Sequence, residues 1–74
     1  MKLCELSKLY LKTNGISYKF FARYLGIEYS YSVRWLNGDI PINEKYIDKI
    51  HEFLNGEWIT PASELLKKGE NNYE

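Results

Sequence analysis

The sequence is poor in the residues from which covalent links and metal sites are built. Its 74 residues include one cysteine, Cys4, and one histidine, His51. A single cysteine cannot form an internal disulfide. One cysteine and one histidine are also too few to build a zinc site from these residues within one copy of the chain. We therefore expect no metal and no cofactor, and we expect Cys4 to be a small buried or half-buried apolar residue.

Long apolar runs are also missing. No segment approaches the roughly 18 consecutive apolar residues of a membrane-spanning helix, and no apolar signal core precedes the acidic Glu5. The expected location is the cytoplasm, with no membrane partner. Because the sequence has no glycine-rich phosphate loop and no evident pair of catalytic acids, we expect no enzyme activity, and a chain of this size leaves little room for a small-molecule pocket.

Neither sign of charge is in excess, but the two signs are unevenly distributed. The formal net charge is zero, whereas residues 1–38 contain six bases and two acids, a net charge of +4. The bases are Lys2, Lys8, Lys12, Lys19, Arg23 and Arg34. A local positive field of this kind favours nucleic acid as a partner.

The remaining composition predicts one folded domain. Hydrophobic residues make up 45% of the chain and aromatic residues 16%, which is too much apolar surface for a disordered chain of balanced charge. The length excludes a second domain. We expect a domain over residues 1–69 and a flexible tail over residues 70–74.

Glycines and capping residues predict the helix boundaries. Asn-Gly pairs at 14–15, 37–38 and 55–56 each follow a segment whose apolar residues recur every three or four positions. Ser17 and Asn43 are good N-caps, and Thr60 followed by Pro61 predicts the start of a last short helix. The pattern predicts an all-α chain of four to five helices, at about residues 3–13, 18–25, 28–36, 44–54 and 61–68.

Two of these helices are predicted to be clearly amphipathic. The core-facing side of the first helix is expected to consist of Leu3, Leu6, Leu9 and Tyr10. That of the fourth is expected to consist of Tyr46, Ile47, Ile50, Phe53 and Leu54.

Two short helices joined by a turn at one glycine, within a small bundle, form the layout of a helix-turn-helix. The segment GISYKFFARYLGIEYSYSVRWLNG, residues 15–38, resembles the helix-turn-helix of phage repressor, Cro and XRE-like regulators. With its flanking helices the resemblance extends over about residues 3–54, and it implies a lambda-repressor-like bundle. The matching positions have structural reasons, namely a small side chain at the helix crossing, a glycine turn, an aliphatic plug and an aromatic core residue: Ala22, Gly26, Ile27 and Trp35.

In that family the second helix of the motif lies in the major groove of double-stranded DNA. If residues 28–36 pack inward through Ser32, Trp35 and Leu36, the opposite strip of the helix faces outward. The resemblance implies that this strip contacts bases through Tyr29, Ser30, Val33 and Arg34. It implies phosphate contacts from Tyr18, Lys19, Asn37 and Lys45.

Structural roles remain open for the same residues. In the alternative interpretation, Tyr29 and Tyr31 cover neighbouring core. Arg34 is then a solvated charge or pairs with Asp39 or Glu44. The lysines of the first helix are interpreted as ordinary solvated side chains.

The leading hypothesis is a sequence-specific DNA-binding regulator of phage or mobile-element type, acting in a bacterial host. A module of this size buries little surface on DNA, so a homodimer on two half-sites about one helical turn apart is expected. The candidate dimer patch is Trp58, Ile59, Leu65 and Leu66. The alternative for these residues is that they pack back on their own domain.

A protein partner is the second hypothesis. Glu28 stands where the family usually has a serine or threonine cap, Ser32 where an aliphatic residue packs, and Tyr18 where a glutamine opens the preceding helix. An acid near phosphates is unfavourable, and a surface with Tyr and Arg suits protein interfaces. The chain would then bind and inhibit a host protein, as antirepressors, antitoxins and anti-CRISPR proteins do.

Overall fold

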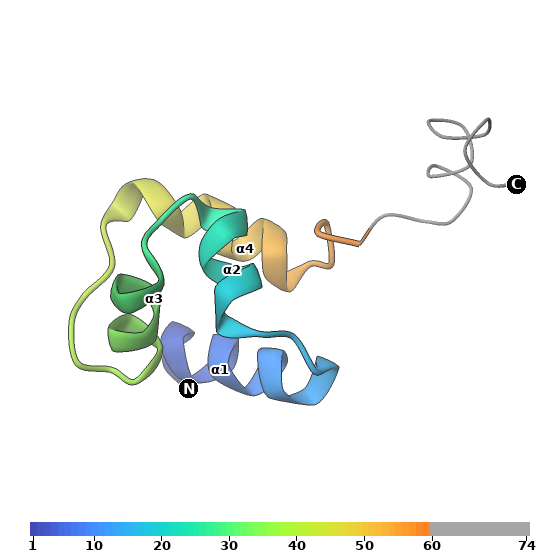
Figure 1. Ribbon diagram of the computed structural model, residues 1–74, viewed down its shortest axis with the longest axis horizontal. Helices are drawn as coiled ribbons and strands as arrows, with labels where there is room; N and C mark the ends of the chain where they lie inside the picture. Colours follow the sequence, from blue (N-terminus) through green and yellow to red (C-terminus); the bar gives the residue numbers. More distant parts are fainter. Residues whose placement is uncertain (60–74) are drawn as a thin grey trace, which may run out of the picture.

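The computed structural model describes residues 1–59, which form four α-helices and one 3₁₀ turn and include no strand (Figure 1). The elements in chain order are α1 (Leu3–Asn14), α2 (Tyr18–Leu25), α3 (Tyr29–Leu36), η1 (Glu44–Tyr46) and α4 (Ile47–Leu54). The predicted all-α class is confirmed. The helix predicted at residues 61–68 and the tail at residues 70–74 lie outside the described residues.

Local capping sets the bounds of α2, and the bounds of both α2 and α3 agree with the prediction. The hydroxyl oxygen of Ser17 accepts a hydrogen bond from the Phe20 amide at 3.1 Å. At the other end of α2, Gly26 has a φ of 78° and donates its amide to the Ala22 carbonyl at 2.9 Å. This left-handed backbone favours glycine. It turns the chain from α2 into α3 within three residues.

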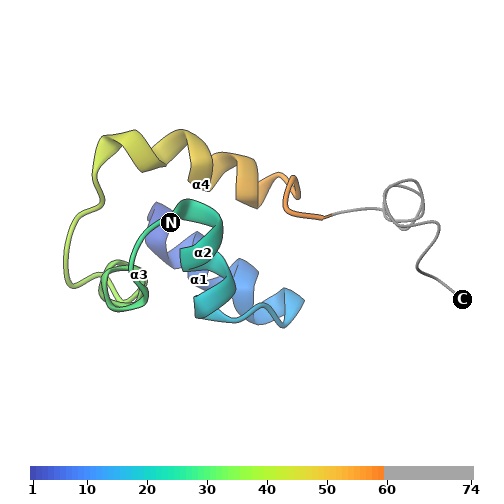
Figure 2. The same ribbon diagram turned by 45° about the horizontal axis from the view of Figure 1, so that its top comes forward.

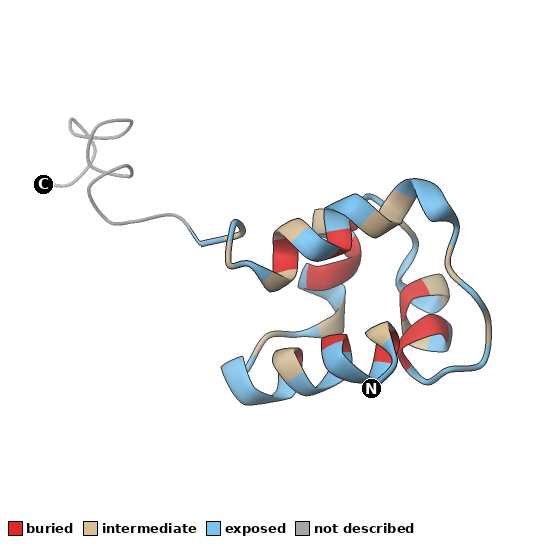
Figure 3. Ribbon diagram, turned by 180° about the vertical axis from the view of Figure 1, so that it is seen from behind, coloured by how far each residue is buried: buried red, intermediate tan, exposed pale blue. Residues whose placement is uncertain are grey.

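The helices enclose one core. Figure 2 shows α4 lying across one side of α1 and α2, with α3 at one end, and α2 packs most extensively on α3. In Figure 3 the buried residues face the space between the helices. The buried apolar residues are Cys4, Leu11, Phe21, Ala22, Leu25, Trp35, Leu36, Ile50 and Phe53. The expected burial of Cys4, Ala22 and Trp35 is confirmed, and Ile27 packs half-buried against this core.

Five rings surround Phe53 and form what we call the aromatic cluster. Their centroids lie 5.0–6.2 Å from that of Phe53, and they belong to Tyr10, Phe20, Phe21, Tyr24 and Trp58. The indole Nε1 of Trp58 donates to the Tyr10 hydroxyl at 3.0 Å. The cluster therefore ties α1, α2, α4 and the residues after α4 together, and large aromatic side chains contribute strongly to such a core.

A polar contact reinforces the packing of α2 against α4. The Tyr24 hydroxyl donates to Glu52 Oε1 at 3.4 Å, and Lys49 Nζ lies 4.8 Å from the centre of the Tyr24 ring and 3.5 Å from Glu52 Oε1. Burial of the phenol raises the pKa of Tyr24; Lys49 opposes this shift, while Glu52 adds to it. The proton is therefore held more tightly in the folded protein than in the unfolded chain.

The predicted core face of α1 is partly wrong. Leu6 and Leu9 are 43% and 49% exposed, and the helix buries Cys4, Ser7 and Leu11 instead. Each step of three residues rotates the side chain by about 60° from its predecessor, so Leu6 and Leu9 turn progressively away from the core. The small side chains of Cys4 and Ser7 allow α1 to approach its neighbours closely.

The fourth predicted helix begins as a tighter turn. Asn43 is the N-cap as predicted, because its Oδ1 accepts from the Lys45 amide at 3.0 Å. The first three residues form η1, and the α-helix starts only at Ile47. The predicted apolar face is confirmed, since Ile50 and Phe53 are fully buried and the other three members are half-buried.

Two buried serines differ in how their hydroxyls are satisfied. Both Ser7 and Ser32 are 0% exposed. Ser32 Oγ donates to the Tyr29 carbonyl at 2.7 Å, whereas Ser7 Oγ has no hydrogen-bond partner within residues 1–59. A buried hydroxyl without a partner costs free energy.

Candidate functional site

The two faces of α3 are clearly separated. Ser32, Trp35 and Leu36 are buried, as predicted. The opposite side, which we call the outer strip, consists of Tyr29, Ser30, Val33, Arg34 and Asn37. Val33 is half-buried and the other four are exposed, with Tyr29 at 51%. The outward placement is therefore confirmed for the four exposed residues and only in part for Val33, while the contacts of all five with DNA stay a prediction.

Tyr31, next to the outer strip, has a structural role. Its hydroxyl accepts a hydrogen bond from the Asn43 amide at 3.1 Å, and its ring packs edge-on against Tyr46 at 6.4 Å. These contacts hold the segment between α3 and η1 against α3. Tyr31 therefore packs on the segment that contains Tyr46, whereas Tyr29 exposes 51% of its surface.

Arg34 lies exposed in the last turn of α3. Pairing with Asp39 or Glu44 is not observed: the ion pair found within residues 1–59 joins Lys49 and Glu52. Asp39 contacts Arg34 only through the backbone, where its amide donates to the Arg34 carbonyl at 2.9 Å. The side-chain hydrogen bonds and the ion pair found within residues 1–59 do not involve the guanidinium, whose donors can therefore bind a ligand in bidentate fashion.

The residues predicted to contact phosphate come from the start of α2, from η1 and from the end of α3. Tyr18 and Lys19 open α2; Lys19 is exposed, while Tyr18 is half-buried against the core. Lys45 is exposed in η1, with its ammonium 5.2 Å from the centre of the Tyr46 ring. Asn37 ends α3. The structure brings this residue close to α1, a contact that the sequence did not indicate.

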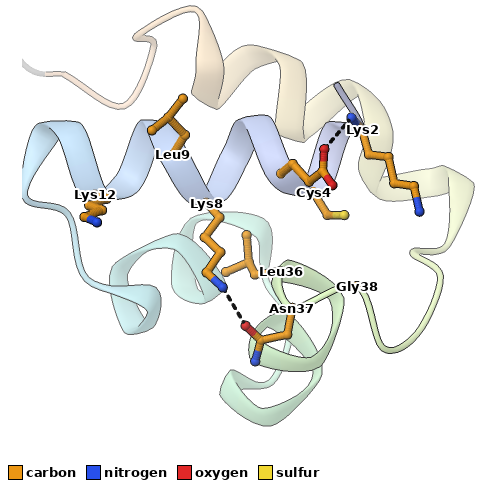
Figure 4. A pocket seen from close by; sticks show the side chains of 9 residues that line it. Lys2, Cys4, Lys8, Leu9, Lys12, Leu36, Asn37 and Gly38 are labelled. Atoms are coloured by element: carbon orange, nitrogen blue, oxygen red, sulfur yellow. Dashed lines mark hydrogen bonds between the residues drawn. The ribbon is translucent and has the colours of Figure 1, made fainter.

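That contact bridges a groove between α1 and α3. Lys8 Nζ donates to Asn37 Oδ1 at 3.1 Å, and Figure 4 shows the Lys8 side chain reaching from α1 toward the end of α3. The groove has a volume of about 520 Å³. We call it the lysine groove; its polar lining comes from Lys2, Glu5, Lys8, Lys12, Asn37 and Gly38. The three lysines, interpreted as ordinary solvated side chains from the sequence, share one surface feature.

Comparisons with protein-family models, with curated proteins and with solved structures gave no match. The arrangement of the described residues therefore carries the functional argument alone. Within residues 1–59, no three His, Cys, Asp or Glu side chains are grouped as a metal site would require. None of the helices in this part of the chain is long and apolar enough to cross a membrane.

The candidate dimer patch is divided by the structure. Trp58 is half-buried and packs on Phe20 and Phe53 of its own domain. Ile59 is 56% exposed. Leu65 and Leu66 lie outside the described residues. Of the four, Ile59 is therefore the described residue that offers apolar surface to a second copy.

Proposed function

We propose that the chain is a sequence-specific regulator that binds double-stranded DNA through a helix-turn-helix formed by α2, the turn at Gly26, and α3. The observation that carries this proposal is the outer strip of α3. It presents a donor-rich arginine, a hydroxyl and apolar groups on a helix whose other face is anchored in the core. A helix held in this way can enter the major groove without rearranging the fold.

In this proposal, the residues of the outer strip bind bases and phosphates of the DNA. Arg34 donates in bidentate fashion to a guanine, Ser30 forms a hydrogen bond to a base edge, and Val33 with Tyr29 contacts thymine methyl groups. Lys19, Lys45, the Tyr18 hydroxyl and Asn37 contact the flanking phosphates. The function is binding without catalysis, and a homodimer would place two copies of α3 on half-sites one helical turn apart.

The test is binding of the purified protein to DNA from immediately upstream of its own coding region, by gel shift at two salt concentrations. We expect specific binding that weakens as salt rises. Arg34→Ala should then reduce affinity for the specific site by about 1–3 kcal/mol. Arg23→Ala is the matched control, because Arg23 is also an exposed arginine in the last turn of an eight-residue helix. Equal losses for the two variants would contradict a base contact by Arg34.

A protein target is the second candidate, and the exposed apolar residues favour it. Leu6 and Leu9 on α1 and Tyr29 on α3 each expose more than two-fifths of their surface. Such residues occur at protein interfaces. Lack of DNA binding even at low salt would support this candidate, and a pull-down from host lysate, with Leu6→Ser and Leu9→Ser variants as controls, would then test it.

A further inference from the structure

Three lysines line the lysine groove. Lys2, Lys8 and Lys12 are exposed and line it from the start of α1 nearly to its end. Residues 2 and 12 are roughly 15 Å apart along the helix axis. Lys8 and Lys12 are four residues apart and therefore lie on the same side of the helix.

The lining of the groove includes one acidic residue. Glu5 is the acidic residue among those that line it, and its Oε1 accepts a hydrogen bond from the Lys2 backbone amide at 3.2 Å, which turns the carboxylate toward the start of the helix. The carbonyls in the last turn of α3 are also paired with amides: Val33 with Asn37 at 3.0 Å, Trp35 with Gly38 at 2.9 Å. Three lysines against one glutamate leave the lining with a net charge of +2.

Asn37 connects this groove with the outer strip. Its backbone ends α3, and its side chain is held by Lys8 from α1. The basic surface therefore continues from the end of the helix proposed to read bases onto α1. A DNA strand carries regularly spaced phosphates at intervals far shorter than roughly 15 Å, so Lys2 and Lys12 can reach separate phosphates of one strand.

We propose that the lysine groove binds the sugar-phosphate backbone beside the half-site read by α3. This proposal rests on the proposed function, because it requires DNA as the partner. Lys2 and Lys12 neutralise phosphates, while Lys8 also fixes Asn37 in position. Such contacts strengthen binding to any sequence and add to the salt dependence without changing base preference.

The experiment compares Lys2→Gln/Lys12→Gln with the unmodified full chain on two duplexes of equal length, one from the upstream region and one of scrambled sequence. This double variant leaves the Lys8–Asn37 hydrogen bond in place. Binding is measured by fluorescence anisotropy between 50 and 200 mM KCl. The control is Arg23→Gln/Lys49→Gln, which removes the same charge from outside the groove.

We expect the slope of log K against log salt to decrease in magnitude by about 2 on both duplexes, with the ratio of specific to scrambled affinity unchanged, and a smaller decrease in the control. An unchanged slope, or one that decreases equally in the control, would overturn the proposal while leaving specific binding intact. If the unmodified chain binds both duplexes equally and the slope still decreases, the groove proposal stands and sequence specificity fails. If it binds neither duplex, both proposals fail.

Discussion

The aromatic cluster around Phe53 and the outer strip of α3 use similar side chains for opposite purposes. In the cluster, the hydroxyls of Tyr10 and Tyr24 are paired with Trp58 and Glu52 inside the protein. In the outer strip, Tyr29 is half exposed and Arg34 lies in solvent. Polar groups that are satisfied internally fix the fold, whereas polar groups left facing solvent are available to a partner. Stability and binding are therefore expected to respond to different substitutions.

The largest effect should come from removing the centre of the cluster. Phe53→Ala deletes a fully buried ring that contacts five other aromatic residues. We expect it to lower the free energy of unfolding by about 3–5 kcal/mol, measured by urea denaturation followed by circular dichroism. Tyr29→Ala should change it by only about 0.5 kcal/mol or less, because the side chain is exposed and away from the cluster. Similar losses for the two variants would break the contrast between the regions.

A smaller effect is expected from the two buried serines, which test the same contrast within the core. Ser32→Ala removes a 2.7 Å hydrogen bond to the Tyr29 carbonyl, and Ser7→Ala removes a hydroxyl without a partner in the described residues. Replacing serine by alanine raises the intrinsic helix propensity by the same amount at both positions. We therefore expect Ser7→Ala to be neutral or stabilising, and Ser32→Ala to be less stable than Ser7→Ala by about 1 kcal/mol.

Thermal denaturation of the parent, Ser7→Ala and Ser32→Ala at one pH measures this difference. The comparison is matched because both serines are fully buried in helices. A stability loss on Ser7→Ala as large as that on Ser32→Ala would show that Ser7 has a partner, such as a buried water.

The sequence predicted best the features that local chemistry determines. Ser17 caps α2 and Gly26 ends it through contacts within four residues, so the bounds of α2 followed from the pattern. The exposed position of Leu6 could not be predicted from the sequence pattern. Which side of α1 becomes buried depends on how the other helices pack against it. The lysine groove was equally hidden, since Lys8 and Asn37 meet across 29 positions of sequence.

The position of Trp58 shows the same limit. From the sequence, this residue was equally consistent with a dimer patch and with packing on its own domain. Its hydrogen bond to Tyr10 spans 48 positions, and no periodicity within either segment contains that information. Residues that join distant segments therefore had to be located by the structure, whereas residues that cap or turn the chain did not.

The smallest effect should appear at the edge of the aromatic cluster, as a pH dependence. Because burial raises the pKa of Tyr24 above its usual value of 10.0, the unfolded chain loses this proton at lower pH than the folded protein. The resulting stability is fully present below pH 10 and decreases as the pH rises through the folded pKa. Tyr24→Phe removes this titration, so its free energy of unfolding should fall less than that of the parent between pH 8 and pH 11.

Urea denaturation at these two pH values measures the difference, and Tyr29→Phe serves as the control for loss of a tyrosine from the exposed outer strip. At pH 8 the Tyr24→Phe substitution should cost little, because the 3.4 Å hydrogen bond to Glu52 is long. An equal alkaline decrease in the parent and Tyr24→Phe would show that the hydroxyl is not shielded by α4. The aromatic cluster would then end at the Tyr24 ring, and its polar edge would resemble the solvent-facing strip of α3.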